Sequence, residues 1–224
     1  MNAVLATGKQ WHDHMKDRLE KKTGVSFIRL KSKDDLSNER LAAINPRYVF
    51  FPHWAHIIPE NIHSNYECVI FHMTDVPFGR GGSPLQNLIE RGIYETRISA
   101  LRCVAELDAG PVYSKRPLSL HGSAEEIFIR AGAIIEDMIV EIMRENPEPF
   151  PQEGAVVSFD RRKPLQSDIS GLQFLDRVFD YIRMLDADGY PRAFLTIGNF
   201  KFEFSRAALK HGYIQADVKI TEKK

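Results

Sequence analysis

Short apolar runs alternate with amphipathic stretches through the first half of the chain. Four of the runs have the length and composition of buried strands: residues 2–7, 25–30, 47–51 and 67–72. After the first run, Trp11, Met15 and Leu19 recur at helical spacing before Gly24, and residues 36–44 predict a second helix. Strands that alternate with helices predict an α/β fold with a mostly parallel sheet and covered faces.

The pattern continues beyond the fourth run and ends in a long helix. Residues 85–91 predict a helix after Pro84, and residues 98–104 and 112–120 predict two extended segments joined by a short connection. Ser123 and Glu126 then have the spacing of a capping box. An apolar stripe follows at helical spacing and predicts one long amphipathic helix: Ile127, Ala131, Ile134, Met138 and Ile142.

A proline-rich segment, residues 146–154, predicts a boundary between a domain of residues 1–153 and a smaller α+β region of residues 154–224. In that region residues 171–185 predict a helix with four inward residues: Leu172, Leu175, Phe179 and Ile182. Gly198 and Asn199 suit a two-residue hairpin turn. The alternation of Phe200, Phe202 and Phe204 predicts a half-buried strand, and residues 213–220 alternate again as a third strand.

The charge balance changes which partners we expect. Thirty basic residues offset thirty acidic ones, and the calculated pI is 7.1. Proteins that bind nucleic acids usually carry a basic face, so we expect no nucleic acid and no membrane as partner. Cys68 and Cys103 lie in apolar runs without a CxxC spacing, which favours reduced, buried thiols. Without a secretory signal pattern or a membrane-length apolar run, we expect a cytoplasmic protein.

His72 and Asp108 are the first candidates for chemistry. His72 ends an apolar run, and ligands of open α/β sheets bind beyond the carboxyl ends of such strands. Histidine also suits proton transfer near neutral pH, although a histidine satisfied within a loop explains the position equally well. Asp108 lies in the tight connection LDAGP, where a structural turn is the stronger explanation from spacing alone.

Other polar clusters give weaker signals. His12 and His14, and His53 and His56, have spacings seen in metal sites, but no acidic or cysteine partner follows a recognisable pattern, so we expect no metal. The run GRGGSP can cradle a phosphate through backbone N–H groups, but it lacks the P-loop lysine and the dinucleotide spacing. Trp54 fits a ligand wall and an ordinary core position equally well.

Several motifs in register resemble the folate-dependent formyltransferases. The run HPSLLPxxRGxxP of that family is matched by six residues: His72, Thr74, Pro77, Arg80, Gly81 and Pro84. The likeness continues through Gly92 and Ser99 to residues 107–111, and residues 54–59 (WAHIIP) resemble the family's YGxILP segment. Residues 182–194 (IRMLDADGYPRAF) resemble the start of the C-terminal region in the family members that formylate nucleotide sugars or methionyl-tRNA.

The resemblance implies a Rossmann-like domain that moves a formyl group from 10-formyltetrahydrofolate, as cosubstrate, to an amine. His72 would be the base or proton shuttle, and Asp108 would hold the charge of the imidazole or an ordered water. Folate would contact seven residues: Trp54, His56, Ile58, Thr74, Arg80, Gly81 and Leu107. The acceptor would contact three: Gly82, Ser83 and Pro84. Arg80 can alternatively serve only to pin its loop.

Ile70 departs from the family pattern. The family has an asparagine two residues before the histidine, where its amide polarises the formyl oxygen. The loss of one such donor costs roughly 100- to 1,000-fold in rate in a studied protease. Thr74, His56 or a backbone N–H group can replace the donor, or the enzyme is slow or inactive.

The expected acceptor is a nucleotide-linked 4-amino-4,6-dideoxy sugar of the pseudaminic acid type. Residues 154–224 are few for an enzyme that binds tRNA, and the net charge is zero. The alternatives are a non-catalytic module that binds folate or a nucleotide sugar, and a formyltransferase for another small amine or for tRNA. We expect a homodimer, because related sugar formyltransferases pair through their C-terminal parts.

Overall fold

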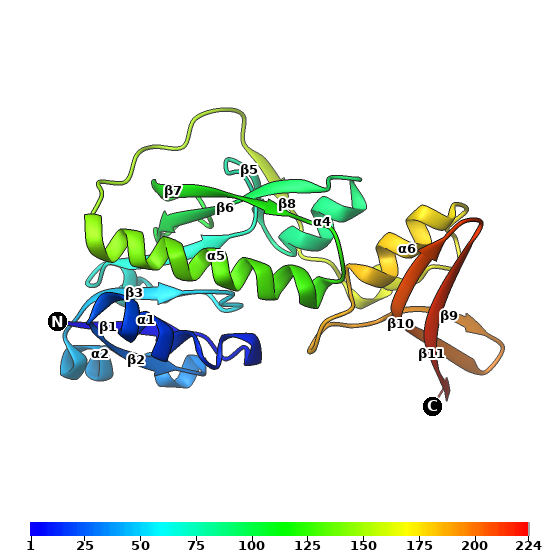
Figure 1. Cartoon of the computed structure of the whole chain (residues 1–224), viewed down its shortest axis with the longest axis horizontal. Helices are drawn as coiled ribbons and strands as arrows, with labels where there is room; N and C mark the ends of the chain where they lie inside the picture. The colour runs from blue at the N-terminus through cyan, green and yellow to red at the C-terminus, as the bar shows by residue number, and fades with distance from the viewer. Residues whose placement is uncertain (224) are drawn as a thin grey trace. The chain divides into compact units, whose positions relative to one another are not determined.

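A computed structural model describes residues 1–223, which form two compact units (Figure 1). The first unit comprises Met1–Gly81, Thr96–Leu118 and Ile129–Ser158. The second comprises Gly82–Glu95, Ser119–Phe128 and the chain from Phe159 onward. Long elements such as the helix of residues 124–145 run through both. The two domains expected from the sequence, 1–153 and 154–224, are a different division of the chain and stay a prediction.

The first unit is built on a six-stranded sheet of order β2-β1-β3-β4-β6-β7. Its strands are β1 (Asn2–Ala6), β2 (Ser26–Leu30), β3 (Pro46–Phe51), β4 (Cys68–His72), β6 (Glu95–Arg102) and β7 (Val112–Ser119). The pairs β1–β2, β1–β3 and β3–β4 are parallel, and β6 runs antiparallel to β4. The α/β fold with a mostly parallel sheet that the sequence predicts is therefore confirmed.

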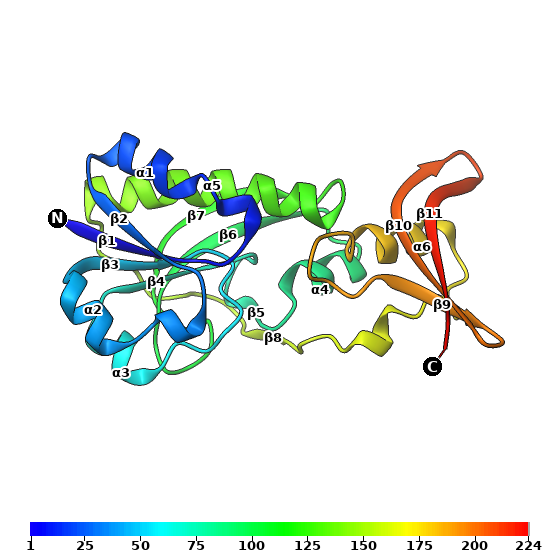
Figure 2. The same ribbon diagram turned by 90° about the horizontal axis from the view of Figure 1, so that it is seen from below.

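Helices cover both faces of this sheet. Figure 2 shows α1 (Met15–Thr23) and α5 (Ala124–Glu145) on one face, and α2 (Asn38–Ile44) and α3 (Glu60–His63) on the other. Gly24 ends α1 with a φ of 69°, a left-handed conformation that glycine adopts without strain. At the start of α5 the backbone N–H of Ser123 donates to Glu126 at 2.7 Å, which confirms the capping box.

The carboxyl ends of the parallel strands position the polar residues of the first unit. Thr7 follows β1, His53 follows β3, and His72 is the last residue of β4. Before His72 the strand is apolar, and Cys68, Val69 and Phe71 are buried. Since parallel strands end at one edge of a sheet, the histidines lie along the edge where α/β proteins bind ligands.

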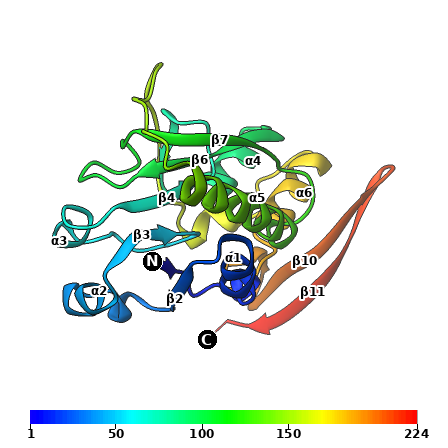
Figure 3. The ribbon, with the colours of Figure 1, turned by 60° about the vertical axis from the view of Figure 1, so that its left-hand side comes forward.

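The second unit combines helices with an antiparallel sheet. It contains α4 (Pro84–Glu90), α6 (Leu175–Arg183), β9 (Ala193–Ile197), β10 (Phe200–Lys210) and β11 (Tyr213–Glu222). The sheet order is β11-β10-β9, so the predicted hairpin and third strand are confirmed. Figure 3 shows β10 and β11 as a long paired ribbon. Gly198 has a φ of 55° in the turn between β9 and β10, as a two-residue hairpin turn requires.

The inner face of α6 differs from the prediction. Leu175 is 44% exposed, whereas Asp180, Ile182 and Arg183 are buried. The helix begins only at Leu175, so this residue lies at an open helix end instead of facing the core. A charged pair, Asp180 and Arg183, occupies inward positions that apolar periodicity alone assigns to the helix surface.

Three features limit the chemistry of the described residues. Among residues 1–223, no helix is long and apolar enough to cross a membrane. No three His, Cys, Asp or Glu side chains of that same stretch lie together as a metal site would need. Both cysteines are free thiols; Cys68 is buried but Cys103 is half-exposed, and burial raises the pKa of Cys103 to about 11.

Candidate active site

His72 and Asp108 lie together in the first unit. The imidazole Nδ1 is 3.4 Å from the Asp108 carboxylate Oδ2, and each residue is 8% exposed. β4 delivers His72, and the connection between β6 and β7 delivers Asp108. The two residues are thirty-six positions apart in sequence, and the structure brings them together as a pair shielded from bulk water.

The glycine-rich loop after β4 wraps around this pair. The carbonyl oxygen of Gly79 lies 2.7 Å from His72 Nε2 and also accepts from the Thr74 hydroxyl at 3.3 Å. The backbone N–H of Gly81 donates to Asp108 Oδ2 at 2.9 Å. Gly79 and Gly81 have φ values of 78° and 106°, which residues with a side chain rarely adopt. The glycines therefore let the loop turn its backbone toward the histidine and the carboxylate.

Both ring nitrogens of His72 face acceptors. At 2.7 Å from a carbonyl oxygen, Nε2 carries a hydrogen and donates to Gly79. In the neutral ring, Nδ1 then presents a lone pair to the Asp108 carboxylate. A proton that arrives at Nδ1 converts this contact into a charge-assisted hydrogen bond. The geometry can therefore receive a proton at Nδ1 and hold the resulting charge.

Gln152 fixes the turn that carries Asp108. Its side-chain amide donates to the carbonyl oxygens of Asp108 and Gly110, both at 2.8 Å. Asp108 itself has a φ of 52°, and a Cβ at Gly110 would lie 1.8 Å from the carbonyl oxygen of Arg102. The LDAGP connection is thus both a tight structural turn and the support of the carboxylate. No sequence motif pointed to Gln152, because it lies in the segment that we expected to be a boundary.

Arg80 is engaged within the same loop. Its guanidinium donates to Gln152 Oε1 from Nε at 3.1 Å and from Nη2 at 2.9 Å, and to Glu106 from Nη1 at 3.1 Å. These contacts pin the loop to the residues that support Asp108. The predicted contact of Arg80 with folate stays a prediction.

Ile70 lies two residues before His72 on β4 and therefore on the same face of the strand. Its side chain packs against an apolar cluster of Val76, Leu101 and Val112. It offers no hydrogen-bond donor at the position where the family has an amide. Among the proposed substitutes, the Thr74 hydroxyl already donates to Gly79.

Comparisons with known proteins show which family the chain resembles. The family model described as "Methionyl-tRNA formyltransferase, C-terminal domain" matches residues 164–221. The solved structure of methionyl-tRNA formyltransferase from Clostridium thermocellum is 51% identical, with a TM-score of 0.96 and coverage of 99% of both chains. The chain belongs to the formyltransferase family.

Two further comparisons concern more distant formyltransferases and a folate-bound fold. The curated methionyl-tRNA formyltransferase of Bacillus cytotoxicus is 26% identical over 79% of this chain, which spans 59% of that relative's length. HypX from Aquifex aeolicus, solved in complex with tetrahydrofolic acid, has 16% identity and a TM-score of 0.74, covering 92% of this chain and 37% of that one. At that identity the similarity to HypX shows the fold alone.

The expected nucleotide-sugar acceptor is wrong. Sugar N-formyltransferases resemble this formyltransferase at only 14–17% identity, whereas the structure at 51% identity is named for methionyl-tRNA. The exclusion of nucleic acid as a partner is wrong for the same reason. Two inferences led to these errors. The C-terminal region was judged too short for an enzyme that acts on tRNA, yet the family model of methionyl-tRNA formyltransferase matches this region. The net charge of zero was taken as evidence against tRNA, yet it does not show where the individual charges lie.

The segment after β3 carries three of the residues expected to contact folate. Trp54 packs against Phe51 of the core cluster, with 5.7 Å between ring centroids, and against the exposed His56, with 5.4 Å between ring centroids. One end of its side chain is therefore in the core and the other is near the surface. Its indole Nε1 is buried and has no hydrogen-bond partner. Ile58 is 7% exposed and belongs to the core cluster, whereas Leu107 in the Asp108 connection is 64% exposed.

The three residues expected to contact the acceptor open the second unit. The N–H of Gly82 donates to the carbonyl oxygen of Phe159 at 2.9 Å, and a Cβ at Gly82 would lie 2.6 Å from the Cα of Arg161. Ser83 has a φ of 48°, and its hydroxyl accepts from the backbone of Arg162 at 3.1 Å. Pro84 is the first residue of α4. Their predicted roles in acceptor binding stay predictions.

A second pair of histidines lies in the first unit. His12 and His53 stack with ring centroids 5.0 Å apart, and His12 Nε2 is 3.2 Å from His53 Nδ1. The other nitrogen of His12 bonds to the Thr7 hydroxyl at 2.8 Å. Burial lowers the pKa of His12 to about 3, helped by the positive charge of Arg29, and lowers the pKa of His53 well below its ordinary value.

Proposed function

We propose that this formyltransferase moves the formyl group of 10-formyltetrahydrofolate to the amine of methionyl-tRNA. The observation that carries the proposal is the His72–Asp108 pair, with 3.4 Å between Nδ1 and Oδ2. It occurs in a chain that is 51% identical, over 99% of its length, to a structure named methionyl-tRNA formyltransferase. The two facts together support the reaction type and the acceptor.

His72 manages the proton in this proposal. An amine that attacks a formyl carbon must lose a proton. Of the two ring nitrogens of His72, Nδ1 has the lone pair that can accept this proton, because Nε2 already donates to Gly79. Asp108 then stabilises the imidazolium through Oδ2, and Gly81 N–H keeps that oxygen in place. The bond between the formyl carbon and N10 of the folate breaks next, the imidazolium returns its proton to N10, and tetrahydrofolate leaves. Proton transfer of this kind contributes roughly 100- to 10,000-fold to a rate.

Trp54 supports the fit of the folate. Its buried indole N–H lacks an acceptor, which costs about 1–3 kcal/mol unless a ligand supplies one. The pterin ring of folate offers such acceptors, so Trp54, with the His56 ring packed edge-on against it, would hold it. 10-Formyltetrahydrofolate, when bound, supplies the carbon that the amine attacks.

A formylation assay tests the proposal directly. The chain is incubated with 10-formyltetrahydrofolate carrying a labelled formyl group and with methionyl-tRNA, uncharged tRNA or a nucleotide-linked 4-amino sugar. We expect label only in methionyl-tRNA. Label in the sugar, or in no acceptor at enzyme concentrations equal to substrate, would overturn the proposal.

A second function is favoured by Ile70 alone. Because the apolar side chain replaces a donor to the formyl oxygen, a folate-binding protein without catalysis is the competing reading. The two differ in one measurement. Tetrahydrofolate binding is measured by calorimetry, and formylation of methionyl-tRNA is measured in single-turnover conditions. Binding without any formylation would favour the folate-binding protein over the enzyme.

A further inference from the structure

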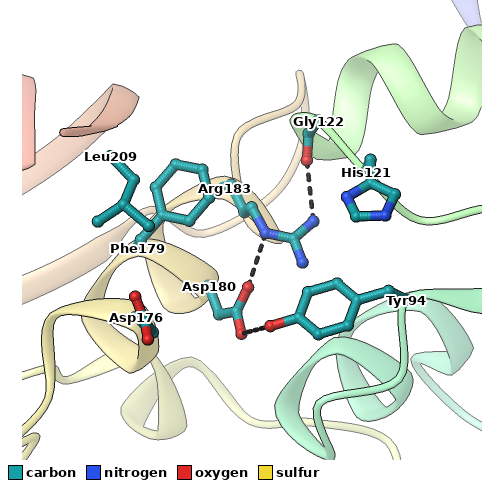
Figure 4. A pocket seen from close by; sticks show the side chains of 8 residues that line it. All are labelled: Tyr94, His121, Gly122, Asp176, Phe179, Asp180, Arg183 and Leu209. Carbon is teal, nitrogen blue, oxygen red and sulfur yellow. Dashed lines mark hydrogen bonds and ion pairs between the residues drawn. The ribbon is translucent and has the colours of Figure 1, made fainter. Parts of the chain in front are cut away.

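The second unit contains a cavity that the formyl-transfer chemistry does not use. Its volume is about 150 Å³, and eight residues line it (Figure 4). Tyr94 precedes β6, His121 and Gly122 precede α5, and Asp176, Phe179, Asp180 and Arg183 belong to α6. The eighth lining residue, Leu209, lies on β10. No motif in the sequence pointed to the cavity, because its members come from four separate stretches of chain.

Four of the eight residues that line this cavity have planar π groups: Tyr94, His121, Phe179 and Arg183. The rings of Tyr94 and His121 stack with centroids 5.5 Å apart and an interplanar angle of 13°. The Arg183 guanidinium lies 5.5 Å from the Tyr94 centroid and 5.7 Å from that of Phe179. Aromatic rings and arginine planes of this kind are the surfaces on which proteins stack unpaired bases.

Arg183 brings an unused hydrogen-bond donor to the cavity. The residue is 3% exposed, and Nε donates to Asp180 at 2.7 Å while Nη1 donates to the carbonyl oxygens of Leu120 and Gly122 at 2.6 and 3.0 Å. Nη2 has no partner. In Figure 4 this nitrogen carries no dashed line and points toward the ring of Tyr94. A buried donor without an acceptor is uncommon, and a ligand oxygen in the cavity would satisfy it.

The charge and the volume of the cavity restrict the kinds of ligand that it can bind. Asp180 already balances Arg183, and Asp176 adds an exposed second carboxylate, so an anion is disfavoured in the cavity. Sites for whole cofactors or drug-sized ligands enclose roughly 300–1,000 Å³, about two to seven times this volume. The features fit one neutral, planar ring whose carbonyl oxygen accepts from Nη2.

We propose that this cavity binds a single unpaired nucleobase that carries a carbonyl oxygen, stacked on Tyr94 and His121. The RNA source rests on the proposed function, since methionyl-tRNA has single-stranded nucleotides at the end that carries its amino acid. A free nucleotide presents the same ring and is the other source. The sugar and phosphate stay outside, beside the exposed side of Tyr94, which is 41% exposed.

Binding of short RNA tests the proposal without any formyl donor. Fluorescence anisotropy is measured on the full chain with labelled tetranucleotides of inosine, of purine riboside, which lacks the carbonyl oxygen of inosine, and of abasic sites. We expect the inosine strand to bind about 10-fold more tightly than the purine riboside strand. Equal affinities, or binding of the abasic strand as tight as that of inosine, would overturn the proposal.

Variants locate the site. Tyr94→Ala is expected to weaken binding of the inosine strand by about 10- to 100-fold, the range that base–aromatic stacking spans, while Tyr94→Phe keeps the ring and the affinity. Tyr213→Ala is the matched control, because Tyr213 is 55% exposed on β11 and does not line the cavity. Equal effects of Tyr94→Ala and Tyr213→Ala would place binding elsewhere and overturn the assignment.

Two further comparisons are made. The first distinguishes an RNA strand from a free nucleotide as the ligand, and the second distinguishes failure of the base site from failure of the proposed function. Tighter binding of the tetranucleotide than of inosine monophosphate supports the RNA strand, and equal binding overturns that source in favour of a free nucleotide. A chain that formylates methionyl-tRNA but binds no inosine strand loses the base site and keeps the proposed function. The converse result keeps the site and removes the function.

Discussion

Two pairs that contain histidine lie at the same edge of one sheet and have opposite surroundings. His72, at the end of β4, has a carboxylate 3.4 Å from one nitrogen and a carbonyl oxygen 2.7 Å from the other. His12 and His53, after β1 and β3, face each other and are surrounded by core and positive charge. The first arrangement accommodates an added proton, and the second excludes it.

The difference shows that strand-end position does not by itself assign chemistry. All three histidines lie at or beyond the carboxyl ends of apolar strands, which is where α/β proteins bind ligands. What separates them is the set of acceptors within hydrogen-bond distance. A proton on His72 gains two charge-assisted partners, whereas a proton on His12 would have to be desolvated by burial and would lie near the positive charges of Arg29, Arg18 and Lys9.

Removing the imidazole of His72 is the strongest test of this comparison. We expect His72→Ala to lower the single-turnover formylation rate by about 100- to 10,000-fold, because the amine then has no proton acceptor. Tetrahydrofolate affinity, measured by calorimetry, should change little. Added imidazole should restore part of the rate. A variant that keeps full activity would remove His72 from the mechanism.

Removing the charge beside that histidine is expected to have the next largest effect. Asp108→Asn keeps an oxygen for the Gly81 N–H but loses the negative charge that stabilises the imidazolium, so the rate should fall by about 10- to 100-fold. Glu106→Gln is the control, since this side chain is 77% exposed and contacts only Arg80 among the loop residues. Similar losses in both variants would argue for a loop effect instead.

Restoring an amide at position 70 should raise the rate. Ile70→Asn places a donor two residues before His72, and we expect formylation about 10-fold faster, a fraction of what one oxyanion donor contributes in other enzymes. The amide also enters an apolar cluster, so the free energy of unfolding should fall by about 1–3 kcal/mol. Ile70→Val, measured at a temperature where both variants are folded, is the control. A folded Ile70→Asn chain with an unchanged rate would contradict the expectation.

The sequence predicted the parts of the structure that follow local rules. Alternating strands and helices, the capping box of Ser123 and the turn at Gly198 depend on periodicity and backbone conformation, and each was found. The pairing of His72 with Asp108 was expected only through resemblance to a family. Gln152 and Arg183 were missed, because their roles depend on partners distant in sequence. The acceptor was wrong because it was inferred from net charge and length.

The buried histidine pair should make stability depend on pH without affecting the chemistry. His12 stays neutral in the folded chain down to about pH 3, while the unfolded chain protonates it below about 6.5. The unfolded state therefore binds more protons as pH falls from 6.5 toward 3, and the free energy of unfolding falls by about 1.4 kcal/mol per pH unit for such a group. Urea unfolding of His12→Asn at several pH values between 7 and 4 should show that its free energy of unfolding depends less steeply on pH than that of the wild type. The formylation rate of this variant at neutral pH should match that of the wild type. His14→Asn, at an exposed position two residues away, should keep the original slope. A slope unchanged by His12→Asn, or a loss of activity as large as that of His72→Ala, would show that the two histidine environments do not differ as described.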